Sequence, residues 1–457
     1  MMKKSLCVIF ICLALLVCAS GALLMPFDRQ DGASEKRILA PFPEFLSGGA
    51  VNLSFPMEFE GWLNDHIGGR RQLTSFYSRL LTAIGTSPNA QVIVGKEGWL
   101  FFRETVPDYT GEGALSEDEL YRLDCVLRQI NDALAGNGVK FILAIAPNKS
   151  TIYPQYMPDA YPHADVPGNA ARLMALGGVR FVDWASLLLE HANEDLYYRG
   201  DTHWNERGAR YAAAALIRAV AGRKDAAPMP DPGAPFRFER DYVGDLTQML
   251  YPVNAPREDR IVFEDGTPQQ YRYTGRMRTL EDINISTEGG ASPLRVLMLR
   301  DSFANSLIGW VSNAFSSVDY SRQMPLPLQK AGEYDIVVLQ IVERRLRELL
   351  DDAPVLFASP ADLFPADENG VGAVAFAKLE SGGVRIWGEV DAAPARVTEC
   401  VVQIIIGDRI AAYYAYPVGG EAGFSLLIPS LEEGATVAVR FIGDEMVTSR
   451  AVSVLFE

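Results

Sequence analysis

Short apolar runs alternate with amphipathic segments through the middle of this chain. Three runs have the length and character of strands that are buried on both faces: VKFILAIAP (139–147), LRVLMLR (294–300) and YDIVVLQIV (334–342). Helical segments separate these runs along the chain. Buried strands that alternate with helices are typical of a parallel sheet covered on both faces, so the pattern predicts an α/β/α fold with a mostly parallel sheet.

Two of the helical segments carry clear start signals. Ser116 is followed three residues later by Glu119, which is a capping box at the start of a helix over 116–135. Asn205 is the expected N-cap of a helix over 205–220. We expect the remaining elements of this region to be a short strand over 179–184 and helices over 169–175, 301–315 and 343–350.

The pattern divides the chain into segments. The predicted α/β domain covers 41–350. It includes amphipathic helices before residue 90, a hairpin over 91–102 and an irregular, Pro- and charge-rich insertion over 224–290. Residues 351–370 resemble a linker because of their Pro and Asp content. Residues 371–457 contain short strands with Gly-rich turns, which predicts a small C-terminal β-sandwich.

The first 27 residues form an export segment. Lys3 and Lys4 precede an uncharged, mostly apolar run over 5–27. Either the run is a signal peptide that is cleaved near Ala19–Ala22, or it is an uncleaved anchor, since about 20 apolar residues can span a bilayer. We prefer the anchor, with residues 28–40 as a polar tether. In both cases the rest of the chain is expected on the extracytoplasmic side of the membrane.

Composition and charge exclude several classes of protein. Hydrophobic residues make up 48% of the 457 positions and charged residues 22%, so most of the chain is not disordered. The net charge of −16 argues against nucleic-acid binding, although a local basic pocket could still hold an anionic substrate. Three of the five Cys lie in the first 18 residues, and we expect the other two, Cys125 and Cys400, to be free and buried.

Candidate chemistry lies where the buried strands end, since ligands of open α/β sheets bind beyond the carboxyl ends of strands. Ser302 follows the strand 294–300 at the start of a helix, where backbone N–H groups and the helix dipole favour an oxyanion. Asp201 and His203 stand one residue apart and could supply the base and its orienting carboxylate. The alternatives are an ordinary helix cap at Asp301 or Ser302 and a surface histidine.

Two cations follow the other strands. Lys149 comes after 139–147 and Arg344 after 334–342, so either could contact substrate, although a solvated lysine and a surface arginine are the common cases. The remaining histidines show no HxH or HxxxH spacing, so we expect neither a metal nor another cofactor.

Four blocks of this sequence resemble the alginate O-acetyltransferase group of the SGNH-hydrolase superfamily, the AlgJ/AlgX-like proteins. The blocks are FEGWLNDHIGGRRQL with VIVGKEGWLFF, APNKSTIYPQYMP, YYRGDTHWNERGARYAAAAL, and LRVLMLRDSFANSLIGWVSNAF with LQIVERRL. The resemblance covers about 41–350. It implies an SGNH-like domain with a permuted motif order, in which the Asp–His pair precedes the serine, and a Ser302–His203–Asp201 triad.

One departure from the superfamily pattern concerns the oxyanion hole. Arg300 occupies the position of the usual Gly before Asp-Ser. The Ser302 N–H is the first candidate donor, Asn305 the second, and Arg300 itself could supply another. Family members commonly carry a C-terminal carbohydrate-binding domain, which is one possible role for 371–457.

The resemblance implies acetyl transfer through an acyl-enzyme on Ser302 to hydroxyls of an exported polysaccharide or cell-envelope glycan. It also implies a membrane-bound O-acyltransferase as the partner that supplies acetyl groups. Two other functions remain open at this point. The same triad could act as an acetyl esterase, or the chain could be a non-catalytic glycan-binding subunit of an export complex.

Overall fold

The computed structural model describes most of the chain beyond residue 38. The described residues are 11, 21, 25, 39–47, 50–222, 228–266, 269–323, 326, 328–351, 356–357, 363–365, 368–380, 383–394, 397–407, 409–417, 422–428 and 430–456. Most of the predicted anchor (1–27), most of the tether (28–40) and most of the predicted linker (351–370) therefore fall outside them. Among the described helices, none has both the length and the apolar character needed to cross a bilayer.

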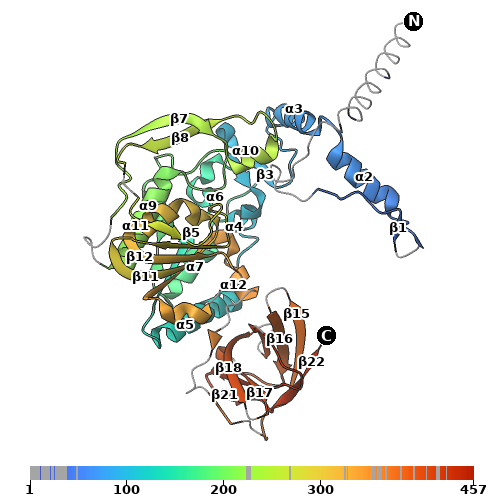
Figure 1. Cartoon of the computed structure of the whole chain (residues 1–457), viewed down its shortest axis with the longest axis vertical. Coiled ribbons are helices and arrows are strands. Elements are labelled where there is room, and N and C mark those ends of the chain that lie inside the picture. The colour runs from blue at the N-terminus through green and yellow to red at the C-terminus, as the bar shows by residue number, and fades with distance from the viewer. Residues whose placement is uncertain are drawn as a thin grey trace.

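A seven-stranded sheet forms the centre of the first domain (Figure 1). Its strands lie in the order β6 (Phe181–Val182), β5 (Lys140–Ala146), β13 (Ile336–Val342), β11 (Ser292–Leu299), β12 (Phe315–Ser321), β10 (Asn284–Glu288) and β9 (Arg272–Thr274). The first five strands pair in parallel, and β10 and β9 add antiparallel pairings, so the sheet is mixed. The three apolar runs of the sequence are its three central neighbours, β5, β13 and β11.

The central strands are buried on both faces, as their uninterrupted apolar sequences predict. On β5, Ile142 and Ala144 pack into the same core as helices α8 (Trp184–Glu190), α9 (Glu206–Ala221) and α11 (Ile308–Ala314). Phe141 and Leu143 point to the opposite face, where they join α5 (Glu117–Ala135) and α7 (Asn169–Leu176). Successive side chains of a strand alternate between faces, so one apolar strand supplies both cores.

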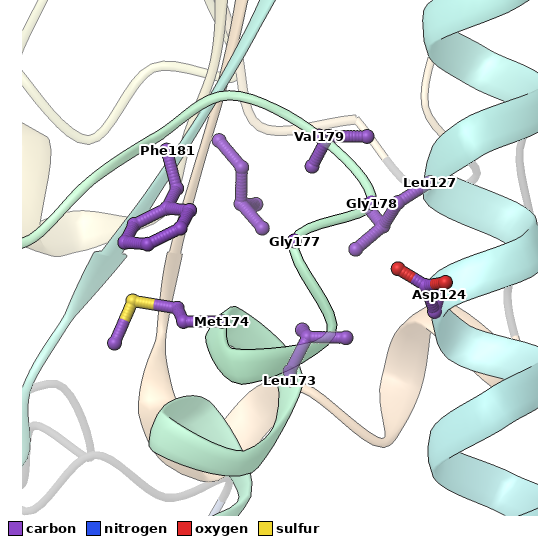
Figure 2. Close-up of a pocket in the computed structure, with 9 residues that line it drawn as sticks. Asp124, Leu127, Leu173, Met174, Gly177, Gly178, Val179 and Phe181 are labelled. Carbon is purple, nitrogen blue, oxygen red and sulfur yellow. The ribbon is translucent and has the colours of Figure 1, made fainter.

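The packing of α5 against the turn before β6 leaves a cavity of about 10 Å³ (Figure 2). Most of its lining is apolar, and Asp124 contributes a carboxylate that accepts a hydrogen bond from Arg128 Nε. Gly178 also lines the cavity, and a side chain could not fit there, because a Cβ would lie 1.9 Å from Asp124 Oδ1. The volume suits at most one water molecule, so this cavity is no substrate site.

The 224–290 stretch is not the irregular insertion that its composition suggested. It contains a hairpin of β7 (Phe236–Tyr242) and β8 (Glu258–Phe263), helix α10 (Asp245–Leu250), and strands β9 and β10. The sequence pattern concealed the hairpin because its two strands are rich in charged residues, which form ion pairs such as Arg260–Asp241. An apolar run is the signal of a buried strand, whereas β7 is mostly exposed and β8 is only partly buried, apart from Ile261.

The N-terminal part adds helices and a hairpin to one side of the domain (Figure 1). Its elements are β1 (Leu46–Ser47), β2 (Ala50–Val51), α2 (Phe55–His66), α3 (Arg70–Thr82), β3 (Val92–Val94), β4 (Leu100–Phe102) and α4 (Val106–Thr110). Strands β3 and β4 pair antiparallel and confirm the predicted hairpin over 91–102. The capping box of Ser116 with Glu119 and the N-cap at Asn205 are also present.

The C-terminal domain is a barrel-like sheet and not the two-sheet sandwich that the sequence predicted. Its strands are β14 (Leu356–Phe357), β15 (Ala373–Glu380), β16 (Gly383–Val390), β17 (Val397–Ile406), β18 (Arg409–Pro417), β19 (Gly423–Ile428), β20 (Thr436–Gly443), β21 (Met446–Thr448) and β22 (Val452–Phe456). Strand β18 pairs with both β17 and β19, which closes the sheet on itself. Alternating strands predict one apolar face, but they do not say whether that face packs on a second sheet or curls around its own core.

Candidate active site

The polar residues after β5, β11 and β13 converge at one edge of the sheet. Asp301, two residues after β11, is the N-cap of a 3₁₀ helix over Ser302–Leu307, and its carboxylate accepts from Phe303 N–H. The same carboxylate accepts from the Val342 N–H at 2.6 Å and from Gln340 Nε2 at 2.9 Å, both on β13. The alternative prediction of an ordinary cap is therefore correct for Asp301, and this cap fixes the turn that carries Ser302.

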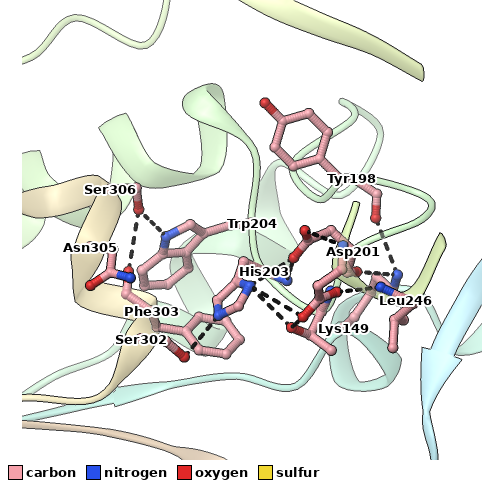
Figure 3. Close-up of polar contacts among 12 residues, drawn as sticks. Lys149, Tyr198, Asp201, His203, Trp204, Leu246, Ser302, Phe303, Asn305 and Ser306 are labelled. Carbon is pink, nitrogen blue, oxygen red and sulfur yellow. Dashed lines mark hydrogen bonds and ion pairs between the residues drawn. The ribbon is translucent and has the colours of Figure 1, made fainter. Parts of the chain in front are cut away.

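Ser302, His203 and Asp201 form a hydrogen-bonded chain (Figure 3). The Ser302 Oγ lies 2.9 Å from His203 Nε2, and His203 Nδ1 lies 2.7 Å from Asp201 Oδ1. The Thr202 hydroxyl donates to Asp245 Oδ2 and therefore offers His203 Nδ1 a second acceptor at 3.0 Å. Two acceptors at Nδ1 place the imidazole proton there, so Nε2 is left to accept from the serine hydroxyl.

Asp201 is buried and held by several donors. Its Oδ1 accepts from the His203 N–H, and its Oδ2 accepts from the Tyr242 hydroxyl and the Asp245 N–H, both at 2.8 Å. Tyr242 also stacks on Tyr198, with ring centroids 3.8 Å apart. Each carboxylate oxygen thus has two donors, which fix its orientation toward the imidazole.

The loop that carries Asp201 is tied down by Lys149. The Lys149 ammonium donates to the carbonyl oxygens of Tyr198, Arg199 and Asp201 at 3.1, 3.0 and 2.6 Å. All three ammonium protons are used, and the side chain is buried. The predicted contact of Lys149 with substrate is therefore wrong in this structure: the residue holds the loop that presents the Asp–His pair.

Two glycines allow the backbone contacts that complete this loop. A Cβ at Gly244 would lie 2.1 Å from the Gly200 carbonyl oxygen, and a Cβ at Gly200 would lie 2.1 Å from Thr247 Oγ1. The close approach brings the Asp245 N–H to Asp201. On the other side of the loop, the Glu258 carboxylate accepts from the N–H groups of Arg199 and Gly200.

Electrostatics favour an ionised Asp201 beside a basic imidazole. Burial lowers the pKa of His203, but the hydrogen bond to Asp201 and the charges of Asp201 and Asp245 outweigh it, so the pKa lies above its ordinary value of 6.5. Burial raises the pKa of Asp201, yet its bond to His203, the His203 charge and backbone donors hold that pKa well below its ordinary range.

Arg300 and Asn305 direct their side-chain donors away from the serine. The Arg300 guanidinium donates to Asn305 Oδ1 and to the carbonyl oxygens of Leu280 and Asp282. The Asn305 amide nitrogen donates to Glu281 Oε1. Both predicted oxyanion donors are therefore engaged in fixing the 280–282 segment. The N–H of Ser302 remains the candidate donor, since it has no acceptor among the described residues.

Arg344 stays a candidate for substrate contact. Its guanidinium lies over the ring of Phe303, the neighbour of Ser302, at 5.8 Å, and over Phe102 at 5.4 Å. Its one hydrogen bond within the described ranges is a long contact of 3.5 Å with Asn148 Oδ1, and the buried Nε has no partner there. The Arg344 guanidinium thus makes fewer hydrogen bonds than that of Arg300 and keeps donors available beside the site.

Asp201, His203 and Asp245 also offer three potential metal ligands within 4.8 Å of one another. The oxygens of the two carboxylates, however, already accept hydrogen bonds from the protein. Tyr242 and backbone N–H groups donate to Asp201, and Thr202 donates twice to Asp245. Carboxylates that accept this many hydrogen bonds suit the orientation of a histidine better than the coordination of a cation.

Sequence reasoning missed Tyr242 and Asp245. Both lie about 40 residues beyond Asp201 in the stretch that the sequence showed only as polar. Asp245 opens α10 and resembles an ordinary acidic residue in a first helical turn, and Tyr242 ends an exposed strand. No spacing rule connects either residue to a carboxylate so far away, so only the folded backbone reveals the contact.

A central sheet with helices on both faces and a Ser–His–Asp chain at the ends of its strands define the class of α/β proteins with a serine-hydrolase-like site. Residues 92–276 match the family model described as SGNH hydrolase-like domain, acetyltransferase AlgX. The matched residues include Asp201 and His203, and the resemblance seen in the sequence is confirmed.

Curated relatives carry names from the same group. The chain is 28% identical over 229 residues to the probable alginate O-acetylase AlgJ of Pseudomonas syringae pv. tomato, covering 48% of this chain and 56% of that protein. It is 30% identical over 167 residues to the probable alginate O-acetylase AlgJ of Pseudomonas putida, covering 35% and 42%. The chain thus spans about half the length of the curated relatives it matches.

Solved structures that match part of this chain include the O-acetyltransferase domain of Pseudomonas putida AlgJ. That comparison gives a TM-score of 0.38 and 19% identity, covering 60% of this chain and 95% of that one. Bacillus cereus PatB1 gives a TM-score of 0.43 and 14% identity, covering 56% and 96%.

Proposed function

We propose that this chain is an SGNH-type serine O-acetyltransferase that modifies hydroxyls of an exported polysaccharide. The observation that carries the proposal is the 2.9 Å contact between Ser302 Oγ and His203 Nε2, with the imidazole oriented by Asp201. Both groups are partly exposed, so a substrate can reach them. The name of the curated relatives, probable alginate O-acetylase, favours a polysaccharide acceptor.

In the first half of the proposed reaction, Ser302 Oγ attacks the carbonyl carbon of an acetyl donor and its proton passes to His203 Nε2. The oxyanion is stabilised by the Ser302 N–H at the start of the 3₁₀ helix. The donor's leaving group then departs with the proton from His203, which leaves acetyl-Ser302. In the second half, His203 takes the proton of a sugar hydroxyl, whose oxygen attacks the acetyl carbon. The bond to Ser302 then breaks, and His203 returns the proton to Ser302 Oγ.

The permuted order of Asp201 and His203 before Ser302 follows from this assignment. We propose an extracytoplasmic location, on the basis of the uncharged run over 5–27 that follows Lys3 and Lys4. In that setting a membrane-bound O-acyltransferase would supply the acetyl groups. The C-terminal barrel would be a carbohydrate-binding domain.

The test compares turnover of a chromogenic acetyl ester by the full chain with and without oligosaccharide acceptors. Ser302→Ala should lower turnover by about 10⁴-fold or more, because no other group can form the acyl-enzyme. Ser317→Ala is the matched control, since Ser317 pairs with Arg295 at the other end of β11 and β12. Acetylated saccharide among the products supports the transferase; turnover unaffected by every acceptor would indicate an esterase. Equal activity of Ser302→Ala and the native chain would indicate a non-catalytic binding subunit.

A further inference from the structure

Helix α3 packs on the domain through its polar side. Ser75 and Ser78 are its buried residues, and the Val253 N–H donates to Ser75 Oγ at 3.1 Å. Three more polar side chains of the helix bond to the segment after α10: Arg71 to the Pro252 carbonyl, Arg79 to the Asn254 carbonyl and Thr82 to the Tyr251 hydroxyl. Serines and hydrogen bonds, not apolar packing, therefore hold α3 in place.

The apolar side of the same helix faces outward. Leu73, Phe76, Tyr77 and Leu80 of α3, with Ile84 just beyond its end, are between 54% and 74% exposed. Their spacing of i, i+3, i+4, i+7 and i+11 places them on a single helical face. A helix at the surface of a globular protein normally turns such a stripe toward the core. Helix α3 does the opposite, since its polar side faces the domain and its apolar side faces outward.

The charge of α3 is also unusual for this chain. Residues 70–84 contain three arginines, at 70, 71 and 79, and no acidic residue, whereas the chain as a whole carries a net charge of −16. A basic helix with an exposed apolar stripe has the composition of helices that lie in the interface of a lipid bilayer. Charge complementarity attracts a basic helix of this kind to an anionic lipid surface.

The surroundings of α3 fit a bilayer as the occupant of this face. The turn between α2 and α3 contacts the uncharged run over 5–27, since the Gly68 N–H donates to the Gly21 carbonyl oxygen at 3.0 Å. Figure 1 shows α3 at the margin of the domain, next to α2. Gly21, a residue of the uncharged run, therefore lies against the turn that leads into α3.

We propose that α3 lies in the headgroup region of an anionic bilayer, with the stripe Leu73, Phe76, Tyr77, Leu80 and Ile84 in the acyl boundary. The neighbouring α2 also exposes apolar residues, but it carries three carboxylates, Glu58, Glu60 and Asp65, and no lysine or arginine, so anionic lipid would repel it. The docking surface is therefore confined to α3. Such docking would fix the orientation of the domain at the membrane, independently of the chemistry at Ser302.

The test measures the lipid depth of α3 in the full chain, reconstituted in nanodiscs of neutral lipid or of neutral lipid with anionic phosphatidylglycerol. Phe76→Cys is labelled with the environment-sensitive fluorophore NBD in a chain whose Cys7, Cys12 and Cys18 are replaced by Ala. Met446→Cys is the matched control, because Met446 is also 62% exposed but lies on β21 of the C-terminal barrel. Brominated lipid should quench the label at 76 about twofold more than the label at 446, and more strongly in anionic discs.

Equal quenching at both positions would overturn the proposal, since an anchor that only tethers the chain would leave both labels in water. A blue-shifted label at 76 without bromolipid quenching would also overturn it, because the stripe would then be covered by protein. Leu80→Cys provides a second label on the same face and should behave as Phe76→Cys does. Ester turnover verifies that each labelled chain is folded, since none of the labelled positions 76, 80 and 446 lies at the candidate active site.

Discussion

At the scale of single residues, the basicity of His203 depends on one buried carboxylate. A neutral imidazole must accept the Ser302 proton, so activity should rise with pH through the pKa of His203, which lies above 6.5. Asp201→Asn removes the charge that raises this pKa and leaves the effect of burial, which lowers it. The acidic limb of the pH–activity profile should therefore move to lower pH. The turnover number should also fall by about 10⁴-fold, because the tautomer is no longer fixed.

The shift of the acidic limb can be measured separately from the loss of rate. With only four histidines in the chain, NMR titration of ¹³C-labelled imidazoles resolves His203, assigned by His203→Gln. Asp245→Asn should shift the pKa of His203 in the same direction but by less, since its carboxylate lies 4.0 Å from Nδ1 and Asp201 lies at 2.7 Å. An unchanged or raised pKa in Asp201→Asn would contradict the assigned role.

The triad residues could be found in the sequence because each belongs to a short motif. Asp201 and His203 are one residue apart, and Ser302 directly follows a recognisable buried strand. Lys149 lies close to the site, as its place after β5 predicts. Its role could not be predicted in the same way. Whether an ammonium meets substrate or three backbone carbonyls depends on a loop about 50 residues away, which no local pattern specifies.

At the scale of elements, the site depends on a contact between the 198–203 loop and the start of α10. Gly244→Ala should disrupt it, because the new Cβ would lie 2.1 Å from the Gly200 carbonyl oxygen and 2.7 Å from the Asp201 nitrogen, both backbone atoms. The two backbones must separate, and Asp201 then loses the Asp245 N–H. We expect turnover to fall with little change in KM, and the free energy of unfolding to fall by about 1–3 kcal/mol.

Gly309→Ala is the matched control for that variant. Gly309 lies within α11, where the nearest atom to a Cβ would be the Tyr271 hydroxyl at 3.7 Å. Alanine is the better helix former, so this change should leave turnover unaltered and should stabilise the chain by about 0.4–1 kcal/mol. If Gly244→Ala behaved like Gly309→Ala in both turnover and urea unfolding, the loop contact would have no part in building the site.

Elements could be predicted from the sequence where burial imposes a pattern. The central strands β5, β11 and β13 are apolar on both faces and were found within a few residues. Strand β12, FSSVDYS, was missed because polar residues interrupt it although it lies inside the sheet. The hairpin of β7 and β8 was missed for a different reason, since β7 is mostly exposed and β8 is only partly buried. Strand β12 and the hairpin are both defined by the strands with which they pair, and not by their local composition.

At the scale of the whole molecule, helix α5 joins the two domains. It packs on the central sheet and also contacts β17 and β18 of the barrel. Cys125 on α5 lies at this junction, with its Sγ 4.0 Å from the Val397 carbonyl oxygen, whereas Cys400 lies inside the barrel. The sequence correctly predicted two free, buried thiols, because distant positions in separate domains seldom meet.

The two thiols therefore report on different parts of the molecule. Burial raises the pKa of both, so neither should react in the native chain at neutral pH. Iodoacetamide labelling in a urea series, mapped by peptide mass spectrometry, should modify Cys125 once the barrel leaves α5, and Cys400 only once the barrel itself unfolds. An added Met446→Cys, on the exposed strand β21, should react at once without urea and verifies the reagent. A peptide that links Cys125 to Cys400, or rapid labelling of Cys125 in the native chain, would contradict the domain contact described for α5.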